Sequence, residues 1–311
     1  MSCFYPKQAI RSAGFTKTGK RSIVFVSKRV ADGMKGNPDL LSGLPCGQCV
    51  GCRLERSRQW AIRMMDEADC HASNSFITLT FSPDGLKTRN ANNLVDLDNM
   101  SLSKRDFQLF FKRFRKAVDV PLRYYMCGEY GDRFGRPHYH AIIFGYDFPD
   151  KIFEDCKDGM QYFSSPFLFE LWPYGSNIIT DVTFDTCAYV ARYIMKKVTG
   201  KLAFSHYDDG QLLPEYTTMS RRPGIGKFWL DTYLQDVYPK DRKFLRDRGF
   251  CKPPKFYDSQ YEIFNPEDYA RIKKQRVEQA LANQAPDPFY DLVVKQHIKM
   301  EQIKCLKRNL E

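Results

Sequence analysis

Two histidines, His138 and His140, stand two positions apart in the apolar run 137–145, which has the length and alternation of a buried strand. Successive side chains of a strand point to opposite faces, so both imidazoles leave one face while Tyr139 and Ile143 pack behind it. The chain has five histidines, which makes such a pair uncommon by chance. The pair predicts two nitrogen ligands for one divalent metal ion. The alternative is two structural histidines.

A carboxylate is expected beside the pair. Glu129 lies nine residues before His138 in a second apolar, alternating run, 124–130, and the residues between the two runs are rich in turn formers. This pattern favours a hairpin that brings Glu129 near both imidazoles. Two imidazoles and a carboxylate suit Mg²⁺ or Mn²⁺ with open coordination positions, whereas a closed structural zinc site needs a fourth ligand. The alternative interpretation is a solvated surface glutamate.

A candidate nucleophile follows further along the chain. Apolar residues recur at helical spacing in segment 185–198, and Tyr189 and Tyr193 are four apart, so both phenols share one face of the predicted helix. Lys196 and Lys197 come one turn later. Tyrosines that simply pack at an interface are the alternative.

A phenol has a pKa near 10 and is a weak nucleophile at neutral pH. A metal ion at the histidine pair would polarise a phosphodiester, and an ammonium group from either lysine would stabilise the phenolate. Together these groups predict the transfer of a phosphodiester to tyrosine. The resulting phosphotyrosine ester conserves the energy of the cut bond, so a free hydroxyl can reverse the step and rejoin the ends.

These motifs, His138-Tyr139-His140 and the segment 189–197, resemble those of rolling-circle replication initiators with a histidine-hydrophobic-histidine signature and two tyrosines. In particular, the chain is similar to the replication proteins of microviruses, small icosahedral single-stranded DNA phages, of the gokushovirus branch. Further matching motifs lie at 45–53, 78–81, 127–131 and 223–226. The resemblance covers roughly residues 45 to 230.

The resemblance implies an α+β fold in which helices flank a central, largely antiparallel sheet. The strand at 78–81 would lie mid-sheet beside the histidine strand, and the tyrosine helix would cross the site. It implies that His138, His140 and Glu129 bind the metal, that Tyr189 and Tyr193 are nucleophiles in either order, and that Lys196 or Lys197 assists.

The implied activity is a nick in origin DNA that leaves a 5′-phosphotyrosine link and a free 3′-hydroxyl. The hydroxyl primes the host DNA polymerase, and the second tyrosine serves to rejoin the displaced strand into a circle. The expected partners are viral origin DNA, single-stranded or melted, the host polymerase and a host helicase.

The charge of the chain agrees with a nucleic-acid partner. Forty-eight basic and 37 acidic residues give a net charge of +11. Basic and aromatic residues alternate in segments 104–116 and 221–229, as in surfaces that hold a phosphate backbone and stack unpaired bases. In the first segment, however, Phe107, Phe110, Phe111 and Phe114 fall at helical spacing. They predict a stripe of core residues, with the charges on the outer face.

Cysteine usage predicts a reducing compartment, which for a phage protein is the host bacterial cytoplasm. No signal peptide is recognisable, and no apolar run reaches the roughly 20 residues needed to cross a bilayer, so no membrane partner is expected. Cys46, Cys49 and Cys52 have the spacing of a zinc knuckle, and Cys3 could complete a structural Zn²⁺ site. An iron–sulfur cluster and ordinary reduced thiols are the alternatives.

Segment 14–20 matches the start of a phosphate-binding loop, but Arg21 stands where a magnesium-binding Ser or Thr is required. A strand-like run follows, so a hairpin turn is predicted there and no ATPase module is expected. The predicted organisation is an N-terminal arm with the cysteine knuckle (1–52), a catalytic domain (53–235) and a basic, partly helical C-terminal tail (236–311). The expected strands are 75–81, 122–130, 137–145 and 176–183, and the expected helices are 53–72, 103–118, 164–171, 185–198, 266–284 and 288–309.

Two other functions remain open from the sequence. A transposase or a plasmid relaxase would use the same signature to move or transfer DNA. A zinc-stabilised protein that binds single-stranded DNA or RNA without chemistry would explain the charge and the cysteines alone.

Overall fold

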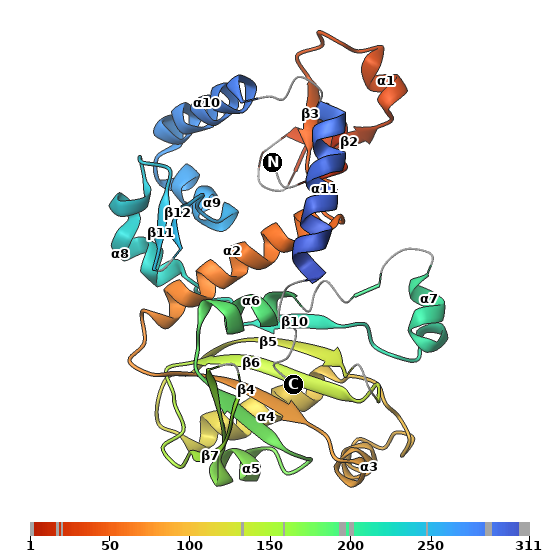
Figure 1. Ribbon diagram of the computed structural model, residues 1–311, viewed down its shortest axis with the longest axis vertical. Coiled ribbons are helices and arrows are strands. Elements are labelled where there is room, and N and C mark those ends of the chain that lie inside the picture. Colours follow the sequence, from red (N-terminus) through yellow and green to blue (C-terminus); the bar gives the residue numbers. More distant parts are fainter. Residues whose placement is uncertain are drawn as a thin grey trace. The chain divides into compact units, whose positions relative to one another are not determined.

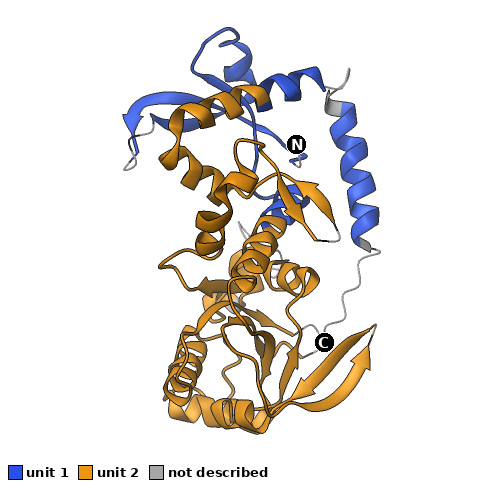
Figure 2. Ribbon diagram, turned by 90° about the vertical axis from the view of Figure 1, so that its left-hand side faces the viewer, with its two compact units in different colours: residues 1–56, 276–311 blue, residues 57–275 orange. Residues whose placement is uncertain are grey.

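The computed structural model describes residues 3–16, 19, 21–131, 134–157, 159–192, 197–198, 202–246, 248–283 and 288–304. The chain forms two compact units (Figure 2). Unit 1 comprises residues 1–56 and 276–311, and unit 2 comprises residues 57–275.

Unit 2 is built on a seven-stranded sheet in the order β10-β5-β6-β4-β9-β8-β7, and every neighbouring pair is antiparallel (Figure 1). The strands are β4 (Asn74–Thr80), β5 (Arg123–Tyr130), β6 (Pro137–Phe144), β7 (Ile152–Lys157), β8 (Met160–Ser164), β9 (Asn177–Thr180) and β10 (Tyr216–Met219). The predicted α+β class with a largely antiparallel sheet is confirmed. The histidine strand β6 lies between β5 and the central strand β4, as expected from the resemblance.

The predicted strand at 176–183 is shorter in the structure, because the residues after Thr180 form the cap of the next helix. Thr183 N–H donates to Thr186 Oγ1 at 2.8 Å, and Thr186 N–H donates back to Thr183 Oγ1 at 3.2 Å. This reciprocal pairing satisfies amide groups at the start of α6 (Phe184–Arg192). Similarly, α5 (Pro166–Leu171) begins later than predicted because the Ser165 hydroxyl caps it.

One face of the sheet packs on α3 (Pro83–Asn92), α4 (Lys104–Ala117) and α5. The predicted stripe on α4 is confirmed, since Phe107, Phe110, Phe111 and Phe114 are all buried in this core. Tyr139, Ala141 and Ile143 of β6 point into the same core, on the side opposite the two histidines.

The histidine face is covered by α6 and by the part of α2 (Val50–Ala68) that belongs to unit 2. The Ser57 hydroxyl donates to the Ala188 carbonyl at 3.0 Å, which ties these two helices together. Trp60 packs on Tyr125 of β5 with ring centroids 5.0 Å apart. Helix α2 begins three residues earlier and ends four residues earlier than the predicted 53–72.

A second, smaller core in unit 2 is formed by the chain that follows β10. Its elements are α8 (Lys227–Val237), β11 (Lys243–Leu245), β12 (Gly249–Cys251), α9 (Lys255–Phe264) and the start of α10 (Pro266–Ala282). Asp66 of α2 connects to it, accepting hydrogen bonds from Tyr257 Oη at 2.6 Å and from Lys243 Nζ at 2.9 Å. Burial raises the pKa of this carboxyl to about 6, and Lys243 opposes the shift.

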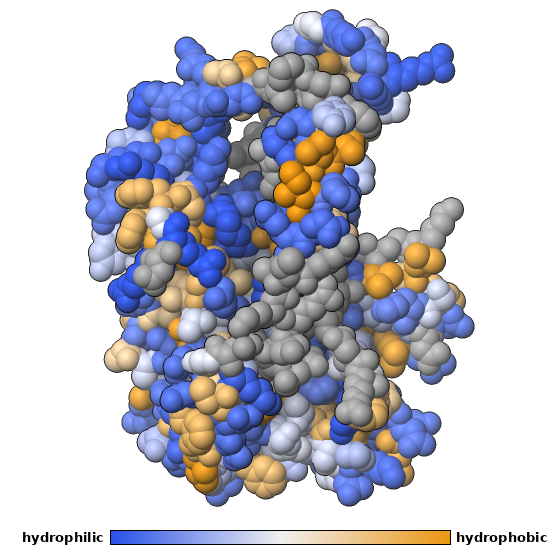
Figure 3. Space-filling view, in the orientation of Figure 1, coloured by the Kyte–Doolittle hydropathy of each residue, from blue (hydrophilic) through white to orange (hydrophobic). Residues whose placement is uncertain are grey.

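Unit 1 contains a three-stranded antiparallel sheet in the order β2-β1-β3, with β1 (Lys7–Phe15), β2 (Arg21–Val26) and β3 (Leu40–Leu44), together with α1 (Lys28–Asp32) and α11 (Pro288–Lys304). The hairpin predicted for segment 14–20 is confirmed, because β2 follows β1 and pairs with it. Exposed apolar side chains gather along α11, among them Val293, Val294 and Ile298 (Figure 3). Among the described helices, none has the length and hydropathy of a membrane span.

Candidate active site

The register of three strands gathers the candidate metal ligands on one face of the sheet. Glu129 of β5 lies opposite His138 of β6, and Thr78 of β4 lies opposite His140. His140 Nε2 and Glu129 Oε1 are 2.7 Å apart, and both side chains are buried. The hairpin predicted from the turn-forming residues therefore exists, and it brings Glu129 to the histidine pair.

The surroundings of His138 favour the form that binds metals. Its Nδ1 lies 2.8 Å from the Arg136 carbonyl, which can only accept a hydrogen bond, so Nδ1 carries the proton and Nε2 of the neutral ring keeps a lone pair. Burial, followed by the neighbouring His140, lowers the pKa of His138 below its ordinary value. Gly131 leaves room for the ring, because a Cβ there would lie 2.6 Å from His138 Cε1.

His140 is held from both sides of its ring. Its Nδ1 lies 2.9 Å from Thr78 Oγ1, while Nε2 faces Glu129. When Nε2–H donates to the carboxylate, the Thr78 hydroxyl donates to Nδ1, and the same hydroxyl can accept from Nδ1–H when Nε2 becomes a ligand. Thr78 therefore supports both tautomers, a role that the sequence pattern did not indicate.

This donor set suits a hard divalent ion, since it combines two imidazole nitrogens with a carboxylate and leaves room for further oxygen ligands. Within the described chain, only the four cysteines described below bring all their ligand atoms within 4.8 Å of one another, so the set of His138, His140 and Glu129 is more open than the cysteine cluster. An ion would enter where Glu129 and His140 now contact each other.

Tyr189 lies directly against this group. Its ring meets His140 edge-on with centroids 5.4 Å apart, and it meets Phe76 of β4 at 6.3 Å. The side chain is buried where α6 crosses the histidine face. The structure therefore brings one predicted nucleophile to the predicted metal ligands.

The other residues of the tyrosine motif are only partly covered. Tyr193 and Lys196 lie outside the described residues. Lys197 and Val198 are in neither a helix nor a strand, so the helix predicted for 185–198 does not extend to its expected end. Val198 N–H instead donates to Tyr207 Oη at 2.9 Å, a bond that holds this segment toward α7 (Ala203–His206).

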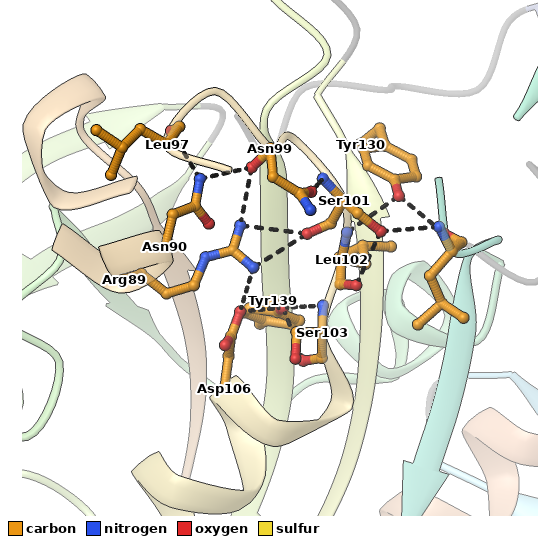
Figure 4. A network of polar contacts seen from close by, with 11 residues as sticks. Arg89, Asn90, Leu97, Asn99, Ser101, Leu102, Ser103, Asp106, Tyr130 and Tyr139 are labelled. Atoms are coloured by element: carbon orange, nitrogen blue, oxygen red, sulfur yellow. Dashed lines mark hydrogen bonds and ion pairs between the residues drawn. The ribbon is translucent and has the colours of Figure 1, made fainter. Parts of the chain in front are cut away.

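On the opposite face, a polar network connects β6 to the loop before α4 (Figure 4). Tyr139 Oη donates to Asp106 Oδ2 at 2.8 Å, and it accepts from Ser103 N–H at 3.0 Å. Asp106 pairs with Arg89 of α3 at 3.4 Å, and both Nη atoms of Arg89 donate to the Ser101 carbonyl at 3.2 Å. Sequence reasoning missed this network, because its members are scattered from α3 to β6 without a motif.

The ion pair in this network leads to a stability prediction. Arg89 and Asp106 are both at most 4% exposed, so Arg89→Met is expected to leave a buried carboxylate without its cation and to cost about 3–5 kcal/mol of unfolding free energy. Urea denaturation of the purified variant measures the change. Lys87→Met on the exposed side of the same helix is the matched control and is expected to be nearly neutral. An equally small effect for Arg89→Met would show that the pair does not stabilise the loop.

Unit 1 contains a second candidate metal site. Cys3, Cys46, Cys49 and Cys52 place their sulfur atoms within 4.8 Å of one another, so the predicted participation of Cys3 is confirmed. Backbone amides point at the sulfurs, with Cys46 N–H 3.2 Å from Cys3 Sγ and Cys49 N–H 3.3 Å from Cys46 Sγ. Although burial opposes it, the amides of Cys49 and Gln48 lower the pKa of Cys46 to about 7. Four such sulfurs can hold a structural metal such as zinc.

Comparison with known proteins gives consistent results. A family model for replication-associated proteins of the ORF2 type matches residues 74–198, which run from β4 through the tyrosine motif. The replication-associated protein VP4 of Bdellovibrio phage phiMH2K is 31% identical over 305 residues, which cover 94% of this chain and 88% of that protein. The replication-associated protein ORF2 of Spiroplasma virus 4 is 30% identical, over 78% of this chain and 77% of its own length. The replication-associated protein ORF4 of Chlamydia phage 1 is 28% identical, over 87% of this chain and 70% of its own length. No solved structure matches the chain significantly.

Proposed function

The chain belongs to the family of microvirus-type replication initiators, and from this we propose that it is a metal-dependent endonuclease and strand transferase that nicks viral origin DNA. The observation that carries the proposal is the contact of Tyr189 with His140, at a ring distance of 5.4 Å, beside the Glu129 carboxylate. A nucleophile, two neutral ligands and an anionic ligand thus share one face of the sheet. We place this chemistry in residues 53–235, with 1–52 and 236–311 as flanking parts.

Nε2 of His138, Nε2 of His140 and the Glu129 carboxylate would hold the metal. A bound Mg²⁺ or Mn²⁺ would supply Lewis-acid polarisation of the scissile phosphate and would neutralise charge in the transition state. The Arg136 carbonyl and the Thr78 hydroxyl orient the two rings from behind.

In the first step the phenol oxygen of Tyr189 or Tyr193 attacks the phosphorus. A bond forms between that oxygen and phosphorus, the bond to the 3′-oxygen breaks, and the phenol proton ends on the leaving 3′-hydroxyl. Lys196 or Lys197 supplies the positive charge that favours the phenolate. The products are a 5′-phosphotyrosine link and a 3′-hydroxyl that primes the host polymerase.

The second tyrosine cuts the displaced strand after one round of synthesis, and the 3′-hydroxyl produced by that cut then attacks the first phosphotyrosine to close the circle. No other energy source is needed, because each phosphodiester is exchanged for another. We expect a host helicase to separate the strands and the reaction to take place in the host cytoplasm. The relatives are phage replication proteins, which favours replication over transposition or plasmid transfer.

We also propose that the four cysteines bind a structural Zn²⁺. A tetrahedral four-sulfur site is closed, so this ion would have no catalytic position and would stabilise unit 1 alone.

Covalent adduct formation tests the nuclease. Wild-type protein incubated with Mn²⁺ and labelled single-stranded fragments that tile the phage genome is expected to give a band that survives denaturing electrophoresis. Tyr189→Phe and Tyr193→Phe should each weaken the band, and the double variant should lose it, because no attacking phenol remains. The exposed Tyr233→Phe is the matched control and should form the adduct normally.

The assay separates the competing functions. An adduct that persists in the double variant would reject the tyrosine mechanism. Absence of any adduct in wild type, with DNA still bound, would favour a zinc-stabilised single-strand binding protein instead.

A further inference from the structure

A pocket of about 500 Å³ opens in unit 2 between α3 and α4, on the side of the sheet opposite the histidine face. It is lined by the loop that joins these helices and by Gln211, which precedes β10. Neither the proposed reaction nor the sequence motifs use this pocket. Its polar lining includes four amide side chains and two guanidinium groups, those of Asn92, Asn93, Asn99, Gln211, Arg89 and Arg105.

This lining specifies the chemistry of a ligand. Amide groups both donate and accept, and they match the edges of unpaired bases, while guanidinium groups match phosphate. No carboxylate is found among the described residues that line the pocket. The volume is within the range of small-molecule sites and is sufficient for one nucleotide.

One donor in the lining is available. Arg89 is only 4% exposed, and its Nη atoms are occupied by Ser101 and Asp106, yet its Nε is a buried donor with no hydrogen-bond partner in the described structure. A buried, unused donor in an otherwise satisfied network indicates a missing acceptor. Arg105, by contrast, is exposed at the start of α4, where its charge can reach a phosphate at the mouth of the pocket.

The rim of the pocket is apolar and conformationally constrained. Leu94 is 94% exposed and has a φ of +55°, an unfavourable value for a leucine, and Val95 beside it is 42% exposed. Val95 N–H donates to the Asn90 carbonyl at 3.1 Å, which holds the turn in place. These two side chains offer an apolar surface for the face of a base above the polar floor.

The pocket is attached to the strands that carry the proposed catalytic residues. Tyr139, between His138 and His140, holds the loop through Ser103 and Asp106. Tyr130, next to Glu129, accepts from Leu102 N–H at 3.0 Å (Figure 4). The pocket therefore has a fixed position relative to the site where the strand would be cut.

We propose that this pocket binds one unpaired nucleotide of the DNA strand, with the base among the amide side chains and the phosphate at Arg105. The proposal rests on the proposed function for the identity of its ligand. It makes the loop between α3 and α4 a determinant of which sequence is nicked, because amide side chains discriminate between base edges. It predicts a base preference at one position away from the cut.

A matched pair of double variants tests the pocket. Arg105→Ala/Gln211→Ala removes two exposed lining groups, and Lys112→Ala/Gln108→Ala removes the same charge and amide from exposed positions of α4 outside the pocket. Binding of a fluorescein-labelled pool of randomised single strands, about 30 nucleotides long, is measured by anisotropy in EDTA, and the bound strands are sequenced. EDTA prevents nicking, so only binding is observed.

The pocket variant is expected to bind the pool about tenfold more weakly, because it loses a charged and a neutral hydrogen-bonding group. It should also lose the base preference at one position, while the control variant keeps both properties. Both variants should melt like wild type, since the substituted side chains are exposed. Unchanged affinity and preference in the pocket variant would overturn the proposal and leave a peptide as the better ligand class.

The result is independent of the adduct assay. Adduct formation together with unchanged binding by the pocket variant would retain the endonuclease and reject the nucleotide pocket. Loss of the base preference in the pocket variant, in a protein that forms no adduct, would retain the pocket and reject the endonuclease.

Discussion

Replacement of His140 with glutamine is expected to slow nicking of supercoiled replicative-form DNA from the same phage by about a thousandfold. The ring nitrogen that faces Glu129 is one of three proposed ligands, and a glutamine amide is a much poorer ligand than imidazole. Losing the metal removes several kcal/mol of transition-state stabilisation, and about 4 kcal/mol corresponds to a factor of a thousand in rate. Single-turnover nicking at saturating protein, with and without Mn²⁺, measures the effect.

The variant also changes a buried pair, so its folding must be checked. Glutamine can still donate to the Glu129 carboxylate, which limits the destabilisation that a deletion would cause. His206→Gln, on α7, is the matched control, because it replaces a surface imidazole outside the candidate site and should nick normally. Wild-type nicking by a folded His140→Gln variant would exclude His140 as a metal ligand.

Loss of the cysteine-bound metal should have the largest effect on stability. The purified chain is expected to contain about one zinc ion, and Cys49→Ser should release it, because a serine hydroxyl replaces one of four thiolate ligands. Binding of structural zinc contributes roughly 10 kcal/mol or more in small zinc domains, so unit 1 is expected to lose its ordered structure. Elemental analysis gives the zinc content, and limited proteolysis shows whether residues 3–56 become accessible.

The matched control is Cys156→Ser, which changes an exposed thiol outside the cluster and should leave both the zinc content and the proteolysis pattern unchanged. A Cys49→Ser variant that keeps zinc and its protease resistance would show that the four sulfurs are ordinary thiols. Iron in place of zinc would keep the site and change its chemistry.

The parts of the fold that could be predicted are those in which one face of an element is continuously apolar. Strands β4, β5 and β6 are buried along almost their whole length, and α4 carries four phenylalanines on one side, so sequence periodicity located them within a few residues. The metal-ligand candidates followed, because alternation along a strand and a short turn fix which side chains share a face.

Other elements gave no such signal. All six residues of β7 are exposed, so the strand has no buried face to produce an alternating pattern. Helix α3 contains Gly85, a poor helix former, because a Cβ there would lie 1.7 Å from the Tyr174 carbonyl oxygen. Its position is set by that close approach and by buried polar contacts. The pocket beside it depends on residues from three separate segments, which periodicity cannot connect.

The alternation of β6 also decides which phenol can react. Tyr139 is only one residue from each histidine, yet its side chain leaves the other face, where burial and the neighbouring Asp106 raise its pKa well above the ordinary value for tyrosine. Its proton is committed to Asp106, at 2.8 Å, and a full sheet separates it from the candidate metal site. A tyrosine adjacent in sequence to the metal ligands is thus insulated from the substrate, and covalent attachment of DNA is restricted to the phenols that the tyrosine motif brings to the histidine face.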